Sequence, residues 1–338
     1  MTAYVFGAGA SYHAGYPLAC DLGDSLIAWL KRNPSPVNDL YGANLRELDK
    51  IYGGLNAFEQ VLTELEDCPS GSRAAAIPDI DRRYMIRNLN LMIPEFFRAL
   101  RERPAPLYEE LAHRYIQQDD EVITFNYDVA CERELRLAGA WEINDGYGFS
   151  LGIPSIRRSP SRVLKLHGSA NWLEVPFRGQ TGFSQSPPNA LGDRPVILPG
   201  EFDFFGYPGC RDPLGPVGNR AGAVPAIVMP TSKKRFFSAT SSGRELEMFW
   251  TSLWESAELA LRSAEHIVII GYGMSAVDER ARALLLCSPN RSARVEIFCG
   301  GSTDRIAREF LANGFQHVSG VSGQRFEDFL ARRAATAT

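Results

Sequence analysis

Five short apolar runs constrain the fold of this 338-residue chain more than any other feature of its sequence. They are rich in β-branched residues, and each stops abruptly at a Gly, Asn, His or Cys. This pattern is typical of buried parallel strands that lead into functional loops. The runs are residues 3–6, 121–125, 162–166, 266–270 and 294–298, and a sixth, weaker run covers 226–229.

Helical patterns lie between these runs. Residues 245–264 place their apolar side chains on one stripe, and Ser302, Thr303 and Asp304 offer N-cap candidates for a helix after the last run. Asn56 and Glu59 resemble a capping box, and residues 79–103 predict one or two further helices. Alternating strands and helices predict an α/β fold, with a Rossmann-like doubly wound parallel sheet covered by helices on both faces.

The spacing of the runs predicts the domain organisation. We expect residues 1–338 to form a single domain, with a predominantly helical insertion or subdomain at 18–118. About a hundred residues separate the first two runs, which is far more than one crossover helix requires. Residues 176–224 are rich in Gly and Pro, and we expect either a binding loop or a poorly ordered one there.

Composition narrows the classes of protein. The net charge of −4 implies no bulk attraction to nucleic acid, so direct nucleic-acid binding is not expected. Six scattered cysteines without a CxxC pair argue against a zinc ribbon or a disulfide framework, and we expect no metal. The sequence has no signal-peptide pattern and no long apolar window, so we expect a cytoplasmic protein without membrane contact.

A glycine-rich loop follows the first run, at residues 7–11 (GAGAS). At this point in a Rossmann unit, backbone N–H groups and a helix dipole hold a pyrophosphate. The GxGxxG pattern is incomplete because Tyr12 occupies the third glycine position. Small residues here would also permit tight packing of a strand against a helix, and His13 leaves a phosphate or ribose contact open.

Polar side chains stand directly after two other runs. Asn126 and Asp128 follow the second, and His167, Gly168 and Ser169 follow the third. Taken singly, these residues also suit turn capping and a structural histidine. Because ligands bind outside the carboxyl ends of parallel strands, all five should converge with the glycine loop. Their joint placement favours a ligand site.

Five segments, in this order, resemble the sirtuin family, and more closely its bacterial sirtuin-like branch associated with antiphage defence. Together they cover most of the chain from residue 3 to about 300. The segments are GAGAS with GYP (7–17), ITFNYD (123–128), LKLHGSANW (164–172), VMPTSKK (228–234) and IIGYGMSAVD (269–278).

The resemblance implies an NAD cleft, with Asn126 and His167 acting at the nicotinamide ribose. It implies that Asp128 supports the ribose pocket and that Gly271 and Asp278 approach the adenosine end. Two departures count against protein deacetylation: the zinc-binding CxxC pairs are missing, and Pro17 is not followed by Asp-Phe-Arg. The full set of expected NAD-binding residues is Gly7, Ala8, Gly9, Ala10, Ser11, Pro17, Thr124, Asp128, Gly168, Ser169, Gly271 and Asp278.

The predicted function is hydrolysis of NAD to nicotinamide and ADP-ribose, as a regulated effector in antiphage defence. Free hydrolysis would harm the host cell, so we expect control by homo-oligomer assembly or by a regulatory partner protein. Three alternatives stay open. They are hydride transfer by a dehydrogenase, sensing of NAD or an ADP-ribose derivative without turnover, and NAD-dependent deacetylation or ADP-ribosylation of protein.

Overall fold

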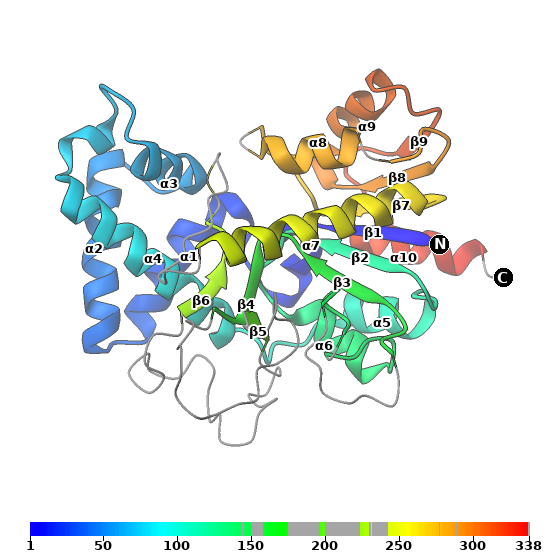
Figure 1. Cartoon of the computed structure of the whole chain (residues 1–338), viewed down its shortest axis with the longest axis horizontal. Coiled ribbons are helices and arrows are strands. Elements are labelled where there is room, and N and C mark those ends of the chain that lie inside the picture. The colour runs from blue at the N-terminus through cyan, green and yellow to red at the C-terminus, as the bar shows by residue number, and fades with distance from the viewer. Residues whose placement is uncertain are drawn as a thin grey trace.

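A computed structural model describes residues 1–143, 145–149, 158–174, 197–199, 224–229, 231, 243–276, 278–287 and 289–336. Six parallel strands form its main sheet, in the order β3-β2-β1-β7-β8-β9 (Figure 1). The predicted Rossmann-like doubly wound sheet is therefore confirmed. The strands are β1 (Thr2–Phe6), β2 (Glu121–Thr124), β3 (Arg162–Lys165), β7 (His266–Ile270), β8 (Arg294–Phe298) and β9 (His317–Gly320).

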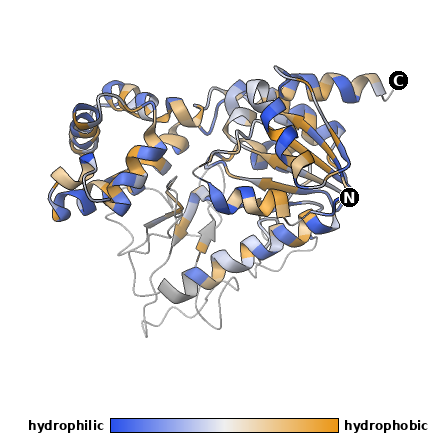
Figure 2. Cartoon of the chain, turned by 90° about the horizontal axis from the view of Figure 1, so that it is seen from above, coloured by the Kyte–Doolittle hydropathy of each residue, from blue (hydrophilic) through white to orange (hydrophobic). Residues whose placement is uncertain are grey.

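The central strands are apolar because both of their faces are covered. β1 pairs with β2 on one side and with β7 on the other, so that Val5 lies opposite both Ile123 and Ile269. All three side chains are fully buried. Figure 2 shows the same strands as mostly hydrophobic, enclosed by helices. Continuous apolar runs, rather than alternating ones, follow from this two-sided burial.

Strand β9 has no counterpart among the predicted runs. It lies at the edge of the sheet, where it pairs only with β8 among the described residues. Its four residues alternate between exposed and half-buried, so the run lacks the apolar character of the central strands. An edge strand needs fewer buried side chains, which is why hydrophobicity alone does not reveal it.

The weak run at 226–229 is a strand in part, but it does not join the main sheet. Residues 224–227 form β6 (Val224–Ile227) in a separate antiparallel sheet of order β5-β4-β6. This small sheet also contains β4 (Gly168–Glu174) and β5 (Ile197–Pro199). Apart from residues 197–199 and 224, the irregular region predicted at 176–224 lies outside the described residues.

The segment between β1 and β2 is helical, and Figure 1 shows α2, α3 and α4 beside the main sheet rather than stacked on it. The predicted capping box is wrong: the helix begins at Phe58, and its N-cap residue Ala57 provides no side-chain cap. Residues 79–99 form one helix that contains Pro94. The segment comprises short 3-10 helices at 8–14, 19–21 and 73–76, and helices α1 (Leu22–Arg32), α2 (Pro36–Tyr52), α3 (Phe58–Asp67), α4 (Asp79–Ala99) and α5 (Pro106–Arg114).

The remaining helices pack around the main sheet. Tyr4 and Phe6 of β1 contact Phe329 of α10 and Tyr108 of α5, so these two helices cover the same face. Among the described residues, no helix is both long and apolar enough to span a bilayer. These helices are α6 (Ala130–Leu137), α7 (Gly243–Ser263), α8 (Glu279–Cys287), α9 (Thr303–Ala312) and α10 (Phe326–Thr336).

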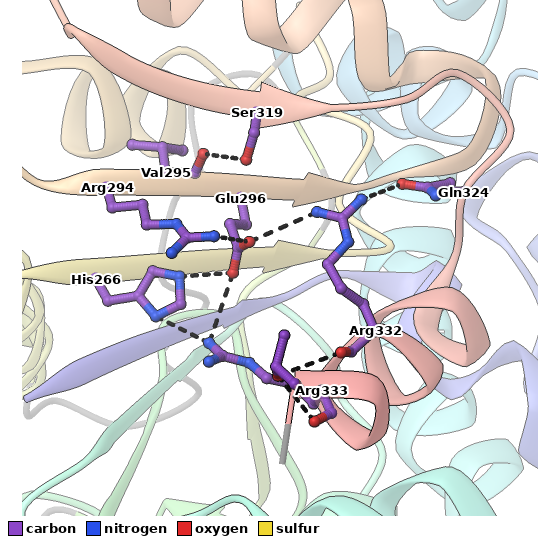
Figure 3. Close-up of polar contacts among 9 residues, drawn as sticks. His266, Arg294, Val295, Glu296, Ser319, Gln324, Arg332 and Arg333 are labelled. Atoms are coloured by element: carbon purple, nitrogen blue, oxygen red, sulfur yellow. Dashed lines mark hydrogen bonds and ion pairs between the residues drawn. The ribbon is translucent and has the colours of Figure 1, made fainter. Parts of the chain in front are cut away.

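A charged cluster attaches α10 to the sheet (Figure 3). The carboxylate of Glu296 on β8 lies 2.8 Å from both His266 Nε2 and an Arg294 nitrogen. Arg332 and Arg333 of α10 each reach the same carboxylate at 3.5 Å. The hydrogen bond from His266, aided by the charges of Arg294 and Arg333, lowers the pKa of Glu296 to about 2.

This cluster predicts loss of stability in acid. A carboxylate whose pKa is depressed in the folded state stabilises the fold above its unfolded-state pKa, and loses that effect as the pH falls. We expect Tm to fall between about pH 4.5 and pH 2. Thermal unfolding of the Glu296→Gln variant should show a shallower dependence over the same range. Equal slopes for the variant and the unmodified protein would contradict the assignment.

Candidate active site

A cavity of about 540 Å³ lies outside the carboxyl ends of the main-sheet strands. Its wall includes the loops after β1 and β7, the neighbouring strands between which the chain order reverses direction across the sheet. Such a switch point is the usual place for ligands in open α/β sheets. The loops after β1, β2, β3, β7 and β8 all contribute to its wall, and the helical segment contributes from α3 and α4.

The glycine loop after β1 packs tightly against the loop after β7. Gly7 N–H donates to Ile270 O, Gly9 N–H donates to Gly271 O, and Ala10 N–H donates to Gly7 O. Gly271 has φ +63°, and a Cβ there would lie 2.1 Å from Ala10 N. These N–H groups are therefore occupied within the fold. The tight-packing interpretation of the glycines thus has direct support, and a phosphate would have to be held largely by other groups.

Asn126, which follows β2, is held in one orientation. Its side-chain Nδ2 donates to Gly7 O and to Ser11 Oγ, both at 3.0 Å. Because Gly7 O is a carbonyl that only accepts, the atom facing it must be the amide nitrogen. Both amide hydrogens are then used, so the side-chain polar atom that Asn126 can offer to a ligand in the cavity it lines is the acceptor Oδ1.

Tyr108 of α5 extends this arrangement. Its hydroxyl lies 3.0 Å from Ser11 Oγ, so Tyr108, Ser11 and Asn126 form one buried hydrogen-bonded chain. Burial raises the pKa of the Tyr108 hydroxyl well above its ordinary value, which keeps its proton in place. Tyr108 itself is absent from the cavity wall, and its hydroxyl is linked to Asn126 through Ser11.

We expect Tyr108→Phe to lower kcat of the nicotinamide release predicted from the sequence by up to about tenfold at an unchanged KM, since one buried hydrogen bond is lost. The matched control is Tyr4→Phe. Tyr4 lies outside the cavity lining, and this variant removes a tyrosine hydroxyl that donates to Tyr115 O. In a Ser11→Ala background the hydrogen bonds between Tyr108 and Asn126 are already broken, so Tyr108→Phe should have no further effect. Additive losses would show that Tyr108 acts independently of Asn126.

His167, directly after β3, faces a carboxylate. Its Nε2 lies 3.2 Å from Asp278 Oδ2, and both side chains are buried. Asp278 Oδ1 in turn accepts from Ala281 N–H at the start of α8, which fixes the carboxylate. We expected Asp278 at the adenosine end of NAD and His167 at the nicotinamide end. Since the two side chains are adjacent, we reassign Asp278 to the His167 end.

The backbone around His167 is fixed by the small antiparallel sheet. Val228 N–H donates to His167 O at 2.9 Å, and Tyr127 OH donates to Val228 O at 2.6 Å. Gly168 has φ +78°, and a Cβ there would lie 2.2 Å from Ala226 O. The chain can therefore turn sharply after His167 only with glycine at this position. Gly168 shapes the backbone beside His167 and does not line the cavity.

Asp278→Asn separates the two roles of this residue. An Asn side chain caps a helix as well as Asp does, so α8 should stay intact. The variant loses the negative charge beside His167, and we expect kcat to fall by about 10- to 100-fold because His167 loses the carboxylate that orients it. Circular dichroism should show an unchanged fold. Unchanged turnover would exclude a role for the carboxylate.

Acidic and aromatic side chains surround His167. Glu59 Oε2 accepts from Ser275 Oγ at 3.2 Å, which brings α3 to the loop that carries Asp278. Phe125 and Tyr272 stack with ring centroids 4.5 Å apart, and Phe125 lies 5.1 Å from the His167 ring. This end of the cavity therefore combines an aromatic wall with two carboxylates.

The cavity brings together most of the predicted site residues. Five of them lie outside its lining: Ala10, Ser11, Thr124, Gly168 and Ser169. Of these, Ser11 and Thr124 instead bond to Asn126, through its side chain and its backbone N–H respectively. The predicted residues that line the cavity are Gly7, Ala8, Gly9, Pro17, Asn126, Asp128, His167, Gly271 and Asp278.

Sequence reasoning missed several lining residues. Glu59 was interpreted as part of a capping box, Phe125 as the end of an apolar run, and Tyr272 only as part of the segment 269–278. Arg325 and Phe326 belong to no motif in the sequence. Only the folding of a segment near the C-terminus brings them to the cavity. The one signal in the sequence that could have indicated these lining residues is that Phe125 and Tyr272 stand directly beside the strand-end residues Asn126 and Gly271. The missed residues include Tyr16, Phe58, Glu59, Phe97, Phe125, Tyr272, Ser275, Cys299, Ser302, Arg325 and Phe326.

No protein-family model matches the chain, and no curated protein matches it. Solved sirtuin structures are similar at low identity. A structure on the basis of sirtuin substrate affinity shares 14% identity, covers 100% of this chain and 93% of its own, and has a TM-score of 0.41. A structure on the mechanism and regulation of Sir2 enzymes shares 14% identity, with 100% and 94% coverage and a TM-score of 0.38. A Sir2 enzyme bound to a propionylated peptide shares 15% identity, with 100% and 93% coverage and a TM-score of 0.37.

Proposed function

We propose that this protein hydrolyses NAD to nicotinamide and ADP-ribose, with Asn126 and His167 at the reacting end. One observation carries the proposal: an acceptor oxygen of Asn126 and the His167–Asp278 pair border the same end of one cavity at the switch point of a Rossmann-like sheet. NAD is the substrate, and the proposal assigns no metal.

The reaction breaks the bond between C1′ of the ribose and the nicotinamide nitrogen. Both electrons of that bond go to the pyridine nitrogen, which neutralises the pyridinium and leaves positive charge on the ribose. A water oxygen then bonds to C1′, and the water proton passes to His167 and from there to solvent. General base catalysis of this kind contributes about 10² to 10⁴ in rate.

The charges around His167 suit this reaction. Positive charge develops on the ribose, and Asp278 and Glu59 place carboxylates at this end of the cavity. Fixed opposite charges in a desolvated site stabilise such a transition state without reorganisation. The Asp278 carboxylate also stabilises the imidazolium that forms when His167 accepts a proton. Asn126 Oδ1, as an acceptor, can orient a ribose hydroxyl or the attacking water.

The test is incubation of the purified full chain with NAD, followed by chromatographic identification of the products. We expect nicotinamide and ADP-ribose in equal amounts. Reduced nicotinamide would instead indicate a dehydrogenase, and transfer of ADP-ribose or loss of an acyl group on an added peptide would indicate protein modification. NAD binding by calorimetry without any product would indicate a sensor. Control by oligomer assembly or a partner, and a role in antiphage defence, stay predictions.

A further inference from the structure

The end of the cavity at β8, far from His167, has a different character. Its wall includes Phe298, Cys299 and the small residues Gly300, Gly301 and Ser302 at and after the end of β8, together with Arg325 and Phe326. The Arg325 side chain makes no ion pair or hydrogen bond with any described residue. A guanidinium without an internal partner that borders a cavity is available to a ligand.

The backbone places Arg325 firmly at this position. Gly300 N–H donates to Gln324 O at 2.8 Å, and Gly323 N–H donates back to Gly300 O at 3.0 Å. The next residue, Phe326, is buried and packs against Phe6 and Tyr108. A Cβ built on Gly300 would lie 3.6 Å from Arg325 Nε. The guanidinium stem therefore runs beside Gly300, at the carboxyl end of β8.

The acidic residues of the cavity lie elsewhere. Asp278 faces His167, Glu59 bonds to the loop that carries Asp278, and Asp128 caps the start of α6 after β2. No other carboxylate of the described residues lines the cavity, so Arg325 is the charged side chain of the lining at its β8 end. Asp328, which accepts from the Arg325 backbone N–H at 2.8 Å, lies outside the lining. Rossmann sites that select NAD place a carboxylate on the adenosine ribose 2′-hydroxyl, whereas sites that select NADP place an arginine near the 2′-phosphate.

The order of the strands decides which phosphate Arg325 can reach. The glycine loop follows β1, and β8 lies two strands away, at about 10 Å. Asn126 and His167 occupy the β2 and β3 side, so the adenosine half of a bound dinucleotide extends toward β7 and β8. The Arg325 stem runs beside Gly300, after β8, so the adenosine ribose is the part of the dinucleotide expected next to it.

We propose that Arg325 binds the 2′-phosphate of the adenosine ribose, and that the preferred substrate of the site is NADP rather than NAD. This inference rests on the proposed function for the orientation of the dinucleotide. It concerns recognition at the opposite end of the cavity from the reaction, so it can be tested by binding alone.

The experiment measures binding of 2′-phospho-ADP-ribose and of ADP-ribose to the full chain by calorimetry. These two probes differ only in the 2′-phosphate. We expect the unmodified protein to bind 2′-phospho-ADP-ribose at least about tenfold more tightly, as a charge-assisted hydrogen bond provides. In Arg325→Ala this preference should vanish, with the affinity for ADP-ribose unchanged. Arg308→Ala, an exposed arginine on α9 outside the cavity, should keep the preference.

Three results would overturn the inference. They are equal affinities for the two probes in the unmodified protein, no binding of either probe, and an equal loss for both probes in Arg325→Ala, which would instead indicate a pyrophosphate contact. Comparison of kcat/KM for NADP and NAD is the second readout. A preference for 2′-phospho-ADP-ribose without nicotinamide release from either dinucleotide would refute the hydrolysis and leave the Arg325 assignment standing.

Discussion

Replacement of His167 by Ala is expected to lower kcat for nicotinamide release by about 10² to 10⁴, the range typical of a lost general base. Asn126→Ala should cause a loss of similar size, because it removes the acceptor oxygen and also releases Gly7 O and Ser11 from their donor. Both losses should appear in kcat more than in KM, since the interactions develop in the transition state. Steady-state measurement of nicotinamide by chromatography provides both constants.

A matched control is His113→Ala, which removes an exposed histidine on α5 outside the cavity. Its turnover should equal that of the unmodified protein. Thermal unfolding of all variants separates lost chemistry from lost folding. If His167→Ala and Asn126→Ala both retain full turnover with an intact fold, the catalytic assignment is wrong, whatever the products of the unmodified protein.

Replacement of Lys165 by Met is expected to lower the free energy of unfolding by about 3–5 kcal/mol, because it leaves a buried charge without its partner. Lys165 Nζ lies 2.7 Å from Glu132 Oε1, and the two side chains are 0% and 1% exposed. Burial raises the pKa of Glu132, and the charge of Lys165 opposes that rise. Without Lys165, the carboxyl must either stay charged in an apolar environment or take up a proton.

Urea unfolding at neutral pH measures this effect. The double variant Lys165→Met with Glu132→Gln removes both charges and should recover part of the lost stability. Arg114→Ala breaks the exposed pair with Glu110 and should cost less than about 0.5 kcal/mol. Lys165 Nζ also donates to Asp128 O in the cavity wall, so the Met variant should lose activity too. A Lys165→Met variant within about 1 kcal/mol of the unmodified protein would contradict the prediction.

The comparison of sequence and structure is most instructive at Glu59 and Asp278. Glu59 stands three residues after Asn56, which suggests a capping box, yet its carboxylate accepts a hydrogen bond from Ser275 in the cavity wall. Asp278 follows a glycine-containing turn, and the turn alone does not show which way it folds back. In both cases the role of the residue depends on a partner far away in the sequence, which the local pattern does not identify.

Sequence by itself determined the parallel sheet and the positions of Asn126 and His167 at strand ends. Buried strands require continuous apolar runs, and the residue that ends a run is visible locally. Only the tertiary structure decided what these residues contact. Ser11 and Tyr108 are 97 positions apart, and the partners of His167 and Glu59, which are Asp278 and Ser275, are likewise remote along the chain. Such contacts depend on how loops from different strands fold over one sheet edge, which no local pattern encodes.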